Sequence, residues 1–160
     1  MSQLIPISMF VNGSRWEGEV PPNERLLDFL RRRLRLTGTK WSCESQVCGA
    51  CTVLVDGAPV SSCSYLAFEA DGRDVTTVEG LAVDGCLNPL QAAFVRNVAA
   101  QCGYCTPGQL MAATALLHEN GSPSFEEMSA WMDGNICRCG CYPAIANAIR
   151  EVSDLGGEAE

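Results

Sequence analysis

Ten cysteines in a chain of 160 residues constrain the fold more than any other feature, because eight of them form two groups of four. The first group, spaced C-x4-C-x2-C-x11-C, consists of Cys43, Cys48, Cys51 and Cys63. The second group, spaced C-x2-C-x31-C-x-C, consists of Cys102, Cys105, Cys137 and Cys139. Disulfides, structural zinc, an iron–sulfur cluster or a redox dithiol could explain such crowding, and the spacing discriminates between them.

The expected cellular compartment narrows the choice among these four explanations of the cysteines. No apolar stretch approaches the roughly 18–20 residues needed to cross a membrane, and the N-terminus "MSQLIPISMF" lacks the basic region and long apolar core of a signal peptide. We therefore expect a cytoplasmic protein without a membrane span. Disulfide frameworks are rare in a reducing cytosol, so metal or redox chemistry is favoured.

The charge of the chain argues against one class of partner. The net charge is −8 and Lys40 is the only lysine, whereas nucleic-acid binding needs clustered basic charge. One basic run, "RRRLRL" from Arg31, lies on a predicted amphipathic helix. A solvated helix face is the favoured interpretation of that run, and a docking patch for an acidic partner is the alternative.

The first half of the chain predicts a mixed sheet packed on one helix. Asn12-Gly13 between two alternating runs predicts a hairpin with a type I′ turn. Leucines at helical spacing predict a helix within residues 23–36. The remaining expected elements are a loop over residues 37–51, a strand over 52–60 that ends in an Asp-Gly turn, and short strands within 61–68 and 71–80.

From Asn88 the apolar period changes from 2 to 3.6 and predicts a small helical bundle. Four helices are expected, within residues 88–100, 106–120, 124–134 and 142–152, with residues 153–160 frayed. Their predicted N-terminal caps are Asn88 with Gln91, Thr106 with Gln109, and Ser124 with Glu127. Most of an apolar stripe should be core: Leu110, Met111, Trp131 and Met132. The prediction is an α+β protein with two domains, residues 1–79 and 80–160.

The spacing of the first cysteine group is that of plant-type [2Fe–2S] ferredoxins. Two irons and two sulfides need four converging thiolates, and a curled loop can supply three of them. Structural zinc usually pairs two C-x2-C knuckles, which this spacing does not match. A thioredoxin-like dithiol should open a helix after a strand, but here a strand follows Cys51. An iron–sulfur cluster is therefore the favoured interpretation.

The spacing of the second group is less specific. Both of its cysteine pairs precede a predicted helix, where free N–H groups and the helix dipole favour thiolates. A zinc site with four thiolates remains a competing interpretation. Cys86, in a loop, is interpreted as a small buried apolar residue. Cys141 adds a third thiol to "CRCGC", and chemistry alone does not exclude it as a ligand.

The two groups together resemble the iron–sulfur portion of the molybdenum hydroxylases. "CGACTVLVDG" is similar to their β-grasp, ferredoxin-like [2Fe–2S] domain, and "QCGYCTPG" with "NICRC" to their helical four-helix-bundle-like [2Fe–2S] domain. The resemblance covers about residues 5–150. A separate chain of this length resembles the small subunit of heterotrimeric members such as carbon monoxide, nicotine and quinoline dehydrogenases, relatives of xanthine oxidase.

This resemblance implies roles for particular residues. Cys43, Cys48, Cys51 and Cys63 would hold the cluster nearer the flavin. Cys102, Cys105, Cys137 and Cys139 would hold the cluster next to the molybdopterin cofactor, and Gln101 and Cys139 would approach the pterin. The resemblance also implies a large molybdopterin-binding partner, a medium FAD-binding partner, and a heterotrimer or a dimer of heterotrimers.

The chain departs from the family pattern in two places. Ser42, Ser45 and Gln46 stand where the family often has a glycine-containing loop, and positive φ is harder for such residues. Gly140 and Cys141 replace the Thr-Gly of the usual "CRCTGY". A tolerated small residue is the favoured interpretation of Cys141, and a free thiol beside the cluster is the alternative.

No apparatus for substrate chemistry is visible in the sequence. The only histidine, His118, is interpreted as a solvated or capping residue at a helix end. We therefore predict an electron-transfer subunit that passes single electrons from molybdopterin through two [2Fe–2S] clusters to flavin or another acceptor. The alternatives are a free-standing two-cluster ferredoxin and a zinc-stabilised binding module.

Overall fold

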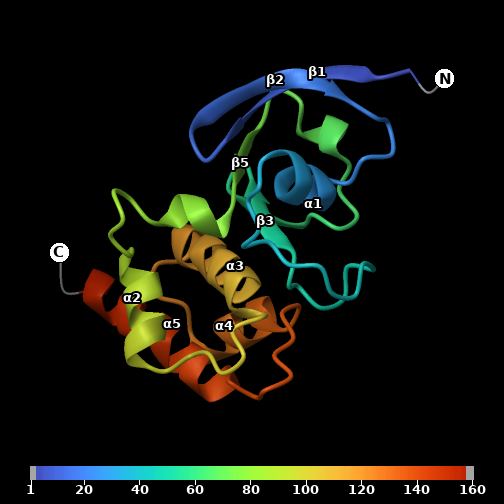
Figure 1. The fold of residues 1–160 in the computed structure, drawn as a ribbon. Coiled ribbons are helices and arrows are strands. Elements are labelled where there is room, and N and C mark those ends of the chain that lie inside the picture. The colour runs from blue at the N-terminus through green and yellow to red at the C-terminus, as the bar shows by residue number, and fades with distance from the viewer. Residues whose placement is uncertain (1–2, 158–160) are drawn as a thin grey trace.

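The computed structural model describes residues 3–157, which form a mixed five-stranded sheet followed by four helices (Figure 1). The strands are β1 (Ile5–Val11), β2 (Ser14–Val20), β3 (Thr52–Val55), β4 (Ala58–Ser61) and β5 (Asp74–Thr76). Their order is β2-β1-β5-β3-β4, and only the central pair β1 and β5 is parallel. The predicted α+β fold is confirmed.

The hairpin at Asn12-Gly13 has the predicted turn. Val11 pairs with Ser14, and φ is 50° at Asn12 and 76° at Gly13. Positive φ at both central residues defines a type I′ turn, whose twist matches that of the flanking strands. Asp56-Gly57 repeats this geometry between β3 and β4, with φ of 50° and 81°.

The helix predicted within residues 23–36 is short and changes character along its length. It begins as α1 (Leu26–Asp28) and continues as the π-helical segment η1 (Phe29–Arg33). Leu26, Phe29 and Leu30 are fully buried in the core against the sheet, and Leu27 is fully buried against Cys51 and Cys63. Their burial secures the segment, because each buried Leu or Phe side chain contributes about 1.5–3 kcal/mol.

One predicted strand is wrong and another is shorter than expected. Residues 61–68 do not form a strand: after Ser61 the chain turns, and Ala67–Ala70 form the 3-10 helix η2. The Glu69 carboxylate accepts the Leu66 N–H at 2.7 Å, while Ala67 and Ala70 are buried against the sheet. Within 71–80 only β5 is a strand, and a second 3-10 helix, η3 (Val78–Leu81), follows.

The four predicted helices are α2 (Pro89–Arg96), α3 (Thr106–Glu119), α4 (Phe125–Met132) and α5 (Tyr142–Gly157). Asn88 and Ser124 cap α2 and α4 as predicted, each in a reciprocal capping box. The cap predicted for α3 is wrong. Its N-cap is Cys105, and Gln109 is buried and donates to the Asn135 carbonyl at 2.8 Å.

The C-terminal helix continues beyond its predicted end. α5 runs to Gly157, so the first part of the tail expected to fray is helical, while residues 158–160 lie outside the described residues. None of the helices in residues 3–157 is long and apolar enough to cross a membrane.

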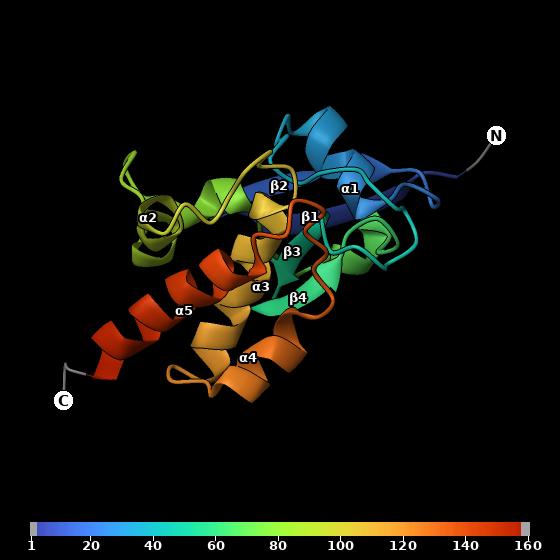
Figure 2. The same ribbon diagram turned by 90° about the horizontal axis from the view of Figure 1, so that it is seen from below.

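Helix α3 joins the two halves of the molecule. Figures 1 and 2 show it beside β3 on one side and α4 and α5 on the other. Leu54 of β3 packs with Met111 and Ala115 of α3, and Trp131 of α4 packs against the same cluster. The predicted stripe is therefore mainly core: Leu110, Met111 and Met132 are buried. The division at residues 79 and 80 stays a prediction.

Candidate metal centres

The first cysteine group lies where the loop after η1 meets the β3–β4 hairpin. Cys51 directly precedes β3, and the pairing of Thr52 with Ser61 brings Cys63 beside it. Both thiols are buried and contact each other, whereas the exposed Cys43 contacts Cys48 within the loop. The structure thus forms two thiol pairs from the four predicted residues, Cys43 with Cys48 and Cys51 with Cys63.

The loop that carries Cys43 and Cys48 adopts left-handed backbone without glycine. φ is 56° at Glu44 and 63° at Gln46, conformations that cost about 1–3 kcal/mol each when no glycine is present. This curl aims two backbone N–H groups at Cys43 Sγ, those of Ser45 at 3.5 Å and Cys48 at 3.4 Å. Donors of this kind stabilise a thiolate or a sulfur-rich anion.

The pKa values of the two thiol pairs differ because their surroundings differ. Backbone N–H donation from Ser45 lowers the pKa of Cys43 to about 6. Burial raises the pKa of Cys51 to about 12. A buried thiol of this kind becomes a thiolate only where a cation compensates for its lost hydration, and metal coordination supplies one.

Trp41 closes the first group on the side of η1. Its ring packs against Cys51 and Cys63, and its buried Nε1–H has no hydrogen-bond acceptor among the described residues. Buried N–H groups normally have a partner, and a sulfide of a cluster ligated by these thiols would supply one. The thiol pairs, the N–H groups aimed at sulfur and this orphaned donor all fit a [2Fe–2S] cluster.

The second cysteine group is supplied by two loops of the helical half. Cys102 and Cys105 precede α3, while Cys137, Cys139 and Cys141 lie between α4 and α5. Cys102 contacts Cys139, and Cys105 contacts Cys137, so the four predicted residues again form two pairs. The buried Cys141 is an additional thiol against Cys137.

Backbone donors also surround this second group. The pKa of Cys102 is lowered, chiefly by the N–H of Tyr104. Burial acts to raise the pKa of Cys137, but N–H donation from Cys141 at 3.4 Å helps to lower it overall. Burial raises the pKa of Cys105 to about 12. Like the first group, this one combines anion-stabilising donors with buried thiols and fits a second cluster.

The two residues predicted to approach a pterin lie together. Gln101 is exposed and donates from Nε2 to the Cys139 carbonyl at 3.3 Å. The hydrogen bond holds the amide beside the partly exposed Cys139.

The two cysteine groups are joined by direct contacts that the sequence analysis missed. Ile136 N–H donates to the Cys48 carbonyl at 2.9 Å, and Asn135 Nδ2 donates to the Gly49 carbonyl at 3.1 Å. Tyr104 donates its hydroxyl hydrogen to the Trp41 carbonyl. These contacts form only when the two halves fold together, so no local sequence pattern predicts them.

The cysteines of both groups converge only as pairs in the structure. In residues 3–157 no three His, Cys, Asp or Glu side chains converge on the position of a single metal ion. Cys86 is exposed, so its interpretation as a buried apolar residue is wrong, because the loop before α2 leaves it at the surface. His118 is exposed in the last turn of α3, as expected.

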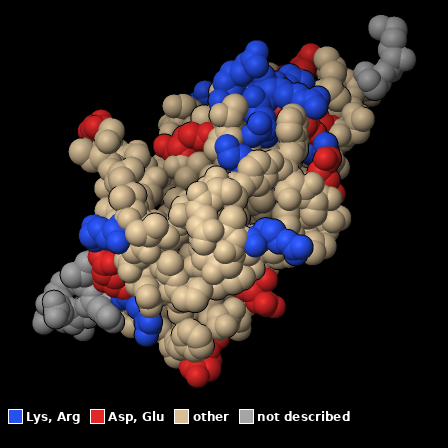
Figure 3. All heavy atoms as spheres, turned by 60° about the horizontal axis from the view of Figure 1, so that its bottom comes forward, with Lys and Arg blue, Asp and Glu red and all other residues tan. Residues whose placement is uncertain are grey.

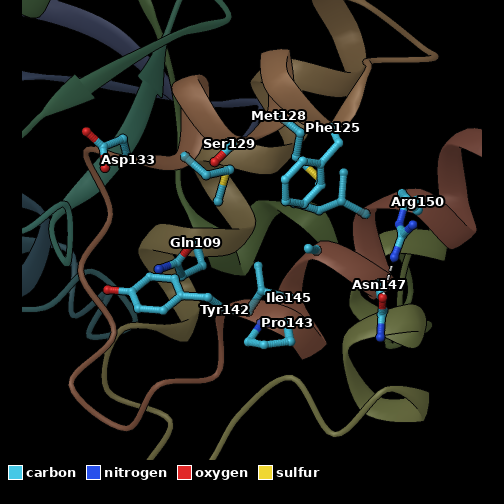
Figure 4. Close-up of a pocket in the computed structure, with 13 residues that line it drawn as sticks. Gln109, Phe125, Met128, Ser129, Asp133, Tyr142, Pro143, Ile145, Asn147 and Arg150 are labelled. Carbon is cyan, nitrogen blue, oxygen red and sulfur yellow. Dashed lines mark hydrogen bonds between the residues drawn. The ribbon is translucent and has the colours of Figure 1, made fainter.

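A surface pocket of about 650 Å³ opens between α4 and α5 (Figure 4). Figure 4 shows Gln109 and Tyr142 at one end and Asn147 and Arg150 at the other. None of the cysteines lines the pocket, but Tyr142 connects it to the second group, because its hydroxyl oxygen accepts the Cys137 N–H at 2.8 Å.

Comparison with known proteins agrees with this geometry. Residues 9–82 match the 2Fe-2S iron-sulfur cluster binding domain family, and residues 77–150 match the [2Fe-2S] binding domain family. The chain is 51% identical to the nicotine 6-hydroxylase small subunit of Paenarthrobacter nicotinovorans, over 92% of this chain and 89% of that one. It is 52% identical to the caffeine dehydrogenase subunit gamma of Pseudomonas sp. (strain CBB1), over 92% and 90%.

A solved structure extends the likeness to the whole fold. Quinoline 2-oxidoreductase from Pseudomonas putida 86 contains a chain that superimposes with a TM-score of 0.92 at 46% identity, over 99% of both chains. The two cysteine groups, the fold and these identities lead to one conclusion. The chain belongs to the family of small iron–sulfur subunits of molybdenum hydroxylases, with two [2Fe–2S] domains in one polypeptide.

Proposed function

We propose that this chain relays single electrons from a molybdopterin centre on a large partner subunit to flavin on a medium partner subunit. The two [2Fe–2S] clusters supply one-electron chemistry, which divides a two-electron substrate oxidation into single steps. Substrate binding and bond chemistry belong to the partner, and the chain contributes the path between the two redox partners.

The thiol pairs support one assignment of ligands. Cys43 with Cys48, and Cys51 with Cys63, would hold the first cluster, each pair on one iron. Cys102 with Cys139, and Cys105 with Cys137, would hold the second. These two pairs are complete without Cys141, which favours Cys139 over Cys141 as the fourth ligand of the second cluster.

The hydrogen bond from Ile136 N–H to the Cys48 carbonyl is the observation that carries the proposal. Cys48 belongs to the first group, and Ile136 is covalently bonded to Cys137 of the second. One hydrogen bond of 2.9 Å therefore connects the two ligand sets through the backbone. Gln109 stiffens this bridge from α3, because it donates to the Asn135 carbonyl from a buried position.

The opposite face of the second group would meet the pterin. Gln101 is exposed, and its carboxamide is held by the Cys139 carbonyl. Its oxygen and its remaining N–H are available to a heterocycle on the large subunit. The exposed Ile136 and Tyr142, 45% and 48% accessible, add apolar area around the same loops. We propose a cytoplasmic heterotrimer, or a dimer of such heterotrimers.

Purification of the native complex tests this function. Under mild conditions the chain should co-elute in size-exclusion chromatography with molybdenum, flavin and two larger subunits. Elution as a lone peak at the mass of the single chain, 17.2 kDa, would instead indicate a free-standing two-cluster ferredoxin.

A further inference from the structure

The basic residues of this acidic chain are concentrated at one place. Five of its eleven Lys and Arg residues lie within residues 31–40, although the net charge is −8, and the sequence holds no Asp or Glu between Phe29 and Cys43. We call Arg31, Arg32, Arg33, Arg35 and Lys40 the arginine-rich surface. Figure 3 shows a dense group of basic side chains over this part of the molecule and only scattered basic groups elsewhere on the same face.

Little of this charge is neutralised within the fold. Arg33 is paired with Glu24 at 2.8 Å, and the exposed Arg32 lies 3.6 Å from Asp28. Among residues 3–157 no ion pair involves Arg31, Arg35 or Lys40. The arginine-rich surface therefore keeps a net positive potential on a molecule that is otherwise negative.

Two of the positive charges lie over Trp41, which packs against the first cysteine group. The Arg31 and Arg32 guanidinium carbons lie 4.6 and 5.2 Å from the centre of the Trp41 ring. The same ring packs against Cys51 and Cys63. A single aromatic side chain thus separates the guanidinium groups from the thiols, so charge that docks at this surface arrives beside the first redox centre.

The surface is also ordered before any partner binds. Arg31 donates to the carbonyls of Thr37 and Thr39 at 2.7 and 2.6 Å, and Lys40 donates to the Thr37 carbonyl at 2.8 Å. The Arg31 bonds hold residues 37–39 against η1, and the Lys40 bond is local to this loop. Side chains that are already ordered lose less conformational entropy on binding.

We propose that the arginine-rich surface docks an acidic face of the protein that accepts electrons from the first cluster. This inference rests on the proposed function, since it concerns the exit of the same relay. The occupant is argued from charge complementarity: a strongly acidic chain would repel an acidic partner everywhere except at this surface. Electrostatic guidance of this kind accelerates association by about 10–10³-fold and weakens as salt screens it.

Two matched double variants distinguish an effect of local charge from an effect of net charge. Both are made in the full chain with its clusters bound. Arg32→Glu/Arg35→Glu reverses two charges on the surface, and Arg15→Glu/Arg150→Glu reverses two exposed charges elsewhere, so both change the net charge equally. After reduction with dithionite, each protein is oxidised in a stopped-flow instrument by ferricyanide, an anionic probe, or by hexaamminecobalt(III), a cationic one.

We expect the surface variant to react with ferricyanide about tenfold more slowly than the control variant at low salt, with the difference lost near 0.5 M salt, where the screening length is only about 4 Å. With hexaamminecobalt(III), the surface variant should react faster than the control variant. Equal rates for the two variants with both probes would overturn the inference. Wild-type protein that holds no reducible cluster would contradict the proposed function instead.

The assembled complex provides the second measurement. When the three subunits are expressed together, the surface variant should release the flavin subunit at lower salt than the control variant, while both keep the molybdenum subunit. Retention of the flavin subunit at the same salt in both variants would overturn the inference even if electron transfer is intact.

Discussion

At the scale of single residues, each cysteine group combines an exposed thiol with a buried one. Cys43 and Cys102 are exposed and have lowered pKa values because backbone N–H groups donate to them. Cys51 and Cys105 have raised pKa values because burial disfavours the thiolate. In each group, therefore, the exposed thiol ionises more readily than the shielded one, whose ionisation metal binding would promote.

Cys139 and Cys141 provide a matched test of the ligand assignment. Cys139→Ala should abolish one of two low-temperature EPR signals of the reduced chain, because it removes one thiolate of the Cys102 and Cys139 pair. Cys141→Ala should keep both signals at full intensity, because the two pairs of the second group are complete without it. The signals are integrated against protein concentration.

The opposite pattern would contradict the assignment. If Cys141→Ala loses a signal while Cys139→Ala keeps both, Cys141 is the fourth ligand of the second cluster. Because the first group lies in the other half of the molecule, its signal serves as an internal control that each variant is folded.

The residues whose role the sequence could not reveal make contacts between distant parts of the chain. The ligand spacings and the caps at Asn88 and Ser124 were predictable, because each is a local pattern in the chain. Tyr104 and Asn135 received no role, because Tyr104 bonds to Trp41 across 63 residues and Asn135 bonds to Gly49 across 86.

At the scale of elements, α3 packs closely against the loop that carries the first cysteine group, and this contact fixes how the two halves meet. A Cβ atom added at Gly108 would lie 2.1 Å from the Gly49 carbonyl oxygen, and one at Gly49 would lie 2.5 Å from Asn135 Nδ2. No side chain fits at either position without moving backbone. The glycine in α3 is therefore required by packing, although glycine weakens a helix by about 0.5–1 kcal/mol relative to alanine.

Gly108→Ala should destabilise the protein in spite of its better helix propensity. The gain of about 0.5–1 kcal/mol is smaller than the cost of overpacking, about 1–3 kcal/mol, and a backbone oxygen cannot rotate away as a side chain can. Thermal unfolding followed by circular dichroism measures the difference. Gly121→Ala is the control, since its nearest neighbour would be 4.0 Å away. Equal or higher stability of Gly108→Ala would refute this packing account.

The strand predicted within residues 61–68 failed for a physical reason at this same scale. The sequence predicts a short strand here, but the Glu69 carboxylate accepts the Leu66 N–H and the chain closes into η2. Short apolar runs do not distinguish strand from helical turn when tertiary burial decides. The long helices were predictable because their period extends over several turns.

Ser124→Ala should cost the protein about 1 kcal/mol of unfolding free energy. The Ser124 side chain accepts the Glu127 N–H at 3.2 Å, and the substitution removes this acceptor while the bond from the residue-124 N–H to the Glu127 carboxylate at 2.8 Å can persist. Urea unfolding of the full chain measures the loss. Ser122→Ala, outside the box, is the control, and an equal loss in both variants would argue against the cap.

At the scale of the whole molecule, an ion pair between α2 and α5 makes stability depend on pH. Arg96 donates to Glu151 at 2.5–2.7 Å and lowers the pKa of this carboxyl below its usual 4.5. The unfolded chain therefore binds this proton more readily than the folded one. The stabilisation is complete above pH 4.5 and is lost as the pH falls through the lower folded value.

Glu151→Gln should flatten this dependence. Between pH 6 and pH 3 the melting temperature of the variant should fall less than that of the wild type, because it has no carboxyl to protonate at this position. Glu119→Gln, which removes an exposed carboxylate at the end of α3, should behave like the wild type. An equal fall in all three proteins would show that the pair does not contribute.

At the scale of the whole molecule, the two cysteine groups have different surroundings. The first lies beside Trp41 and the basic side chains over it, and the loops of the second carry Gln101 and the exposed Ile136 and Tyr142. Between them, the backbone bridge from Cys48 to Ile136 keeps the two groups in a fixed relation. This arrangement suits a subunit that stands between two different redox partners.

The most direct test of this account is low-temperature EPR of the dithionite-reduced native chain, with the spins integrated against protein concentration. Two distinct S = ½ signals that total about two spins per chain are the result that two [2Fe–2S] clusters require. A single signal of about one spin per chain would leave one cysteine group without a cluster, and the relay through both groups would be wrong.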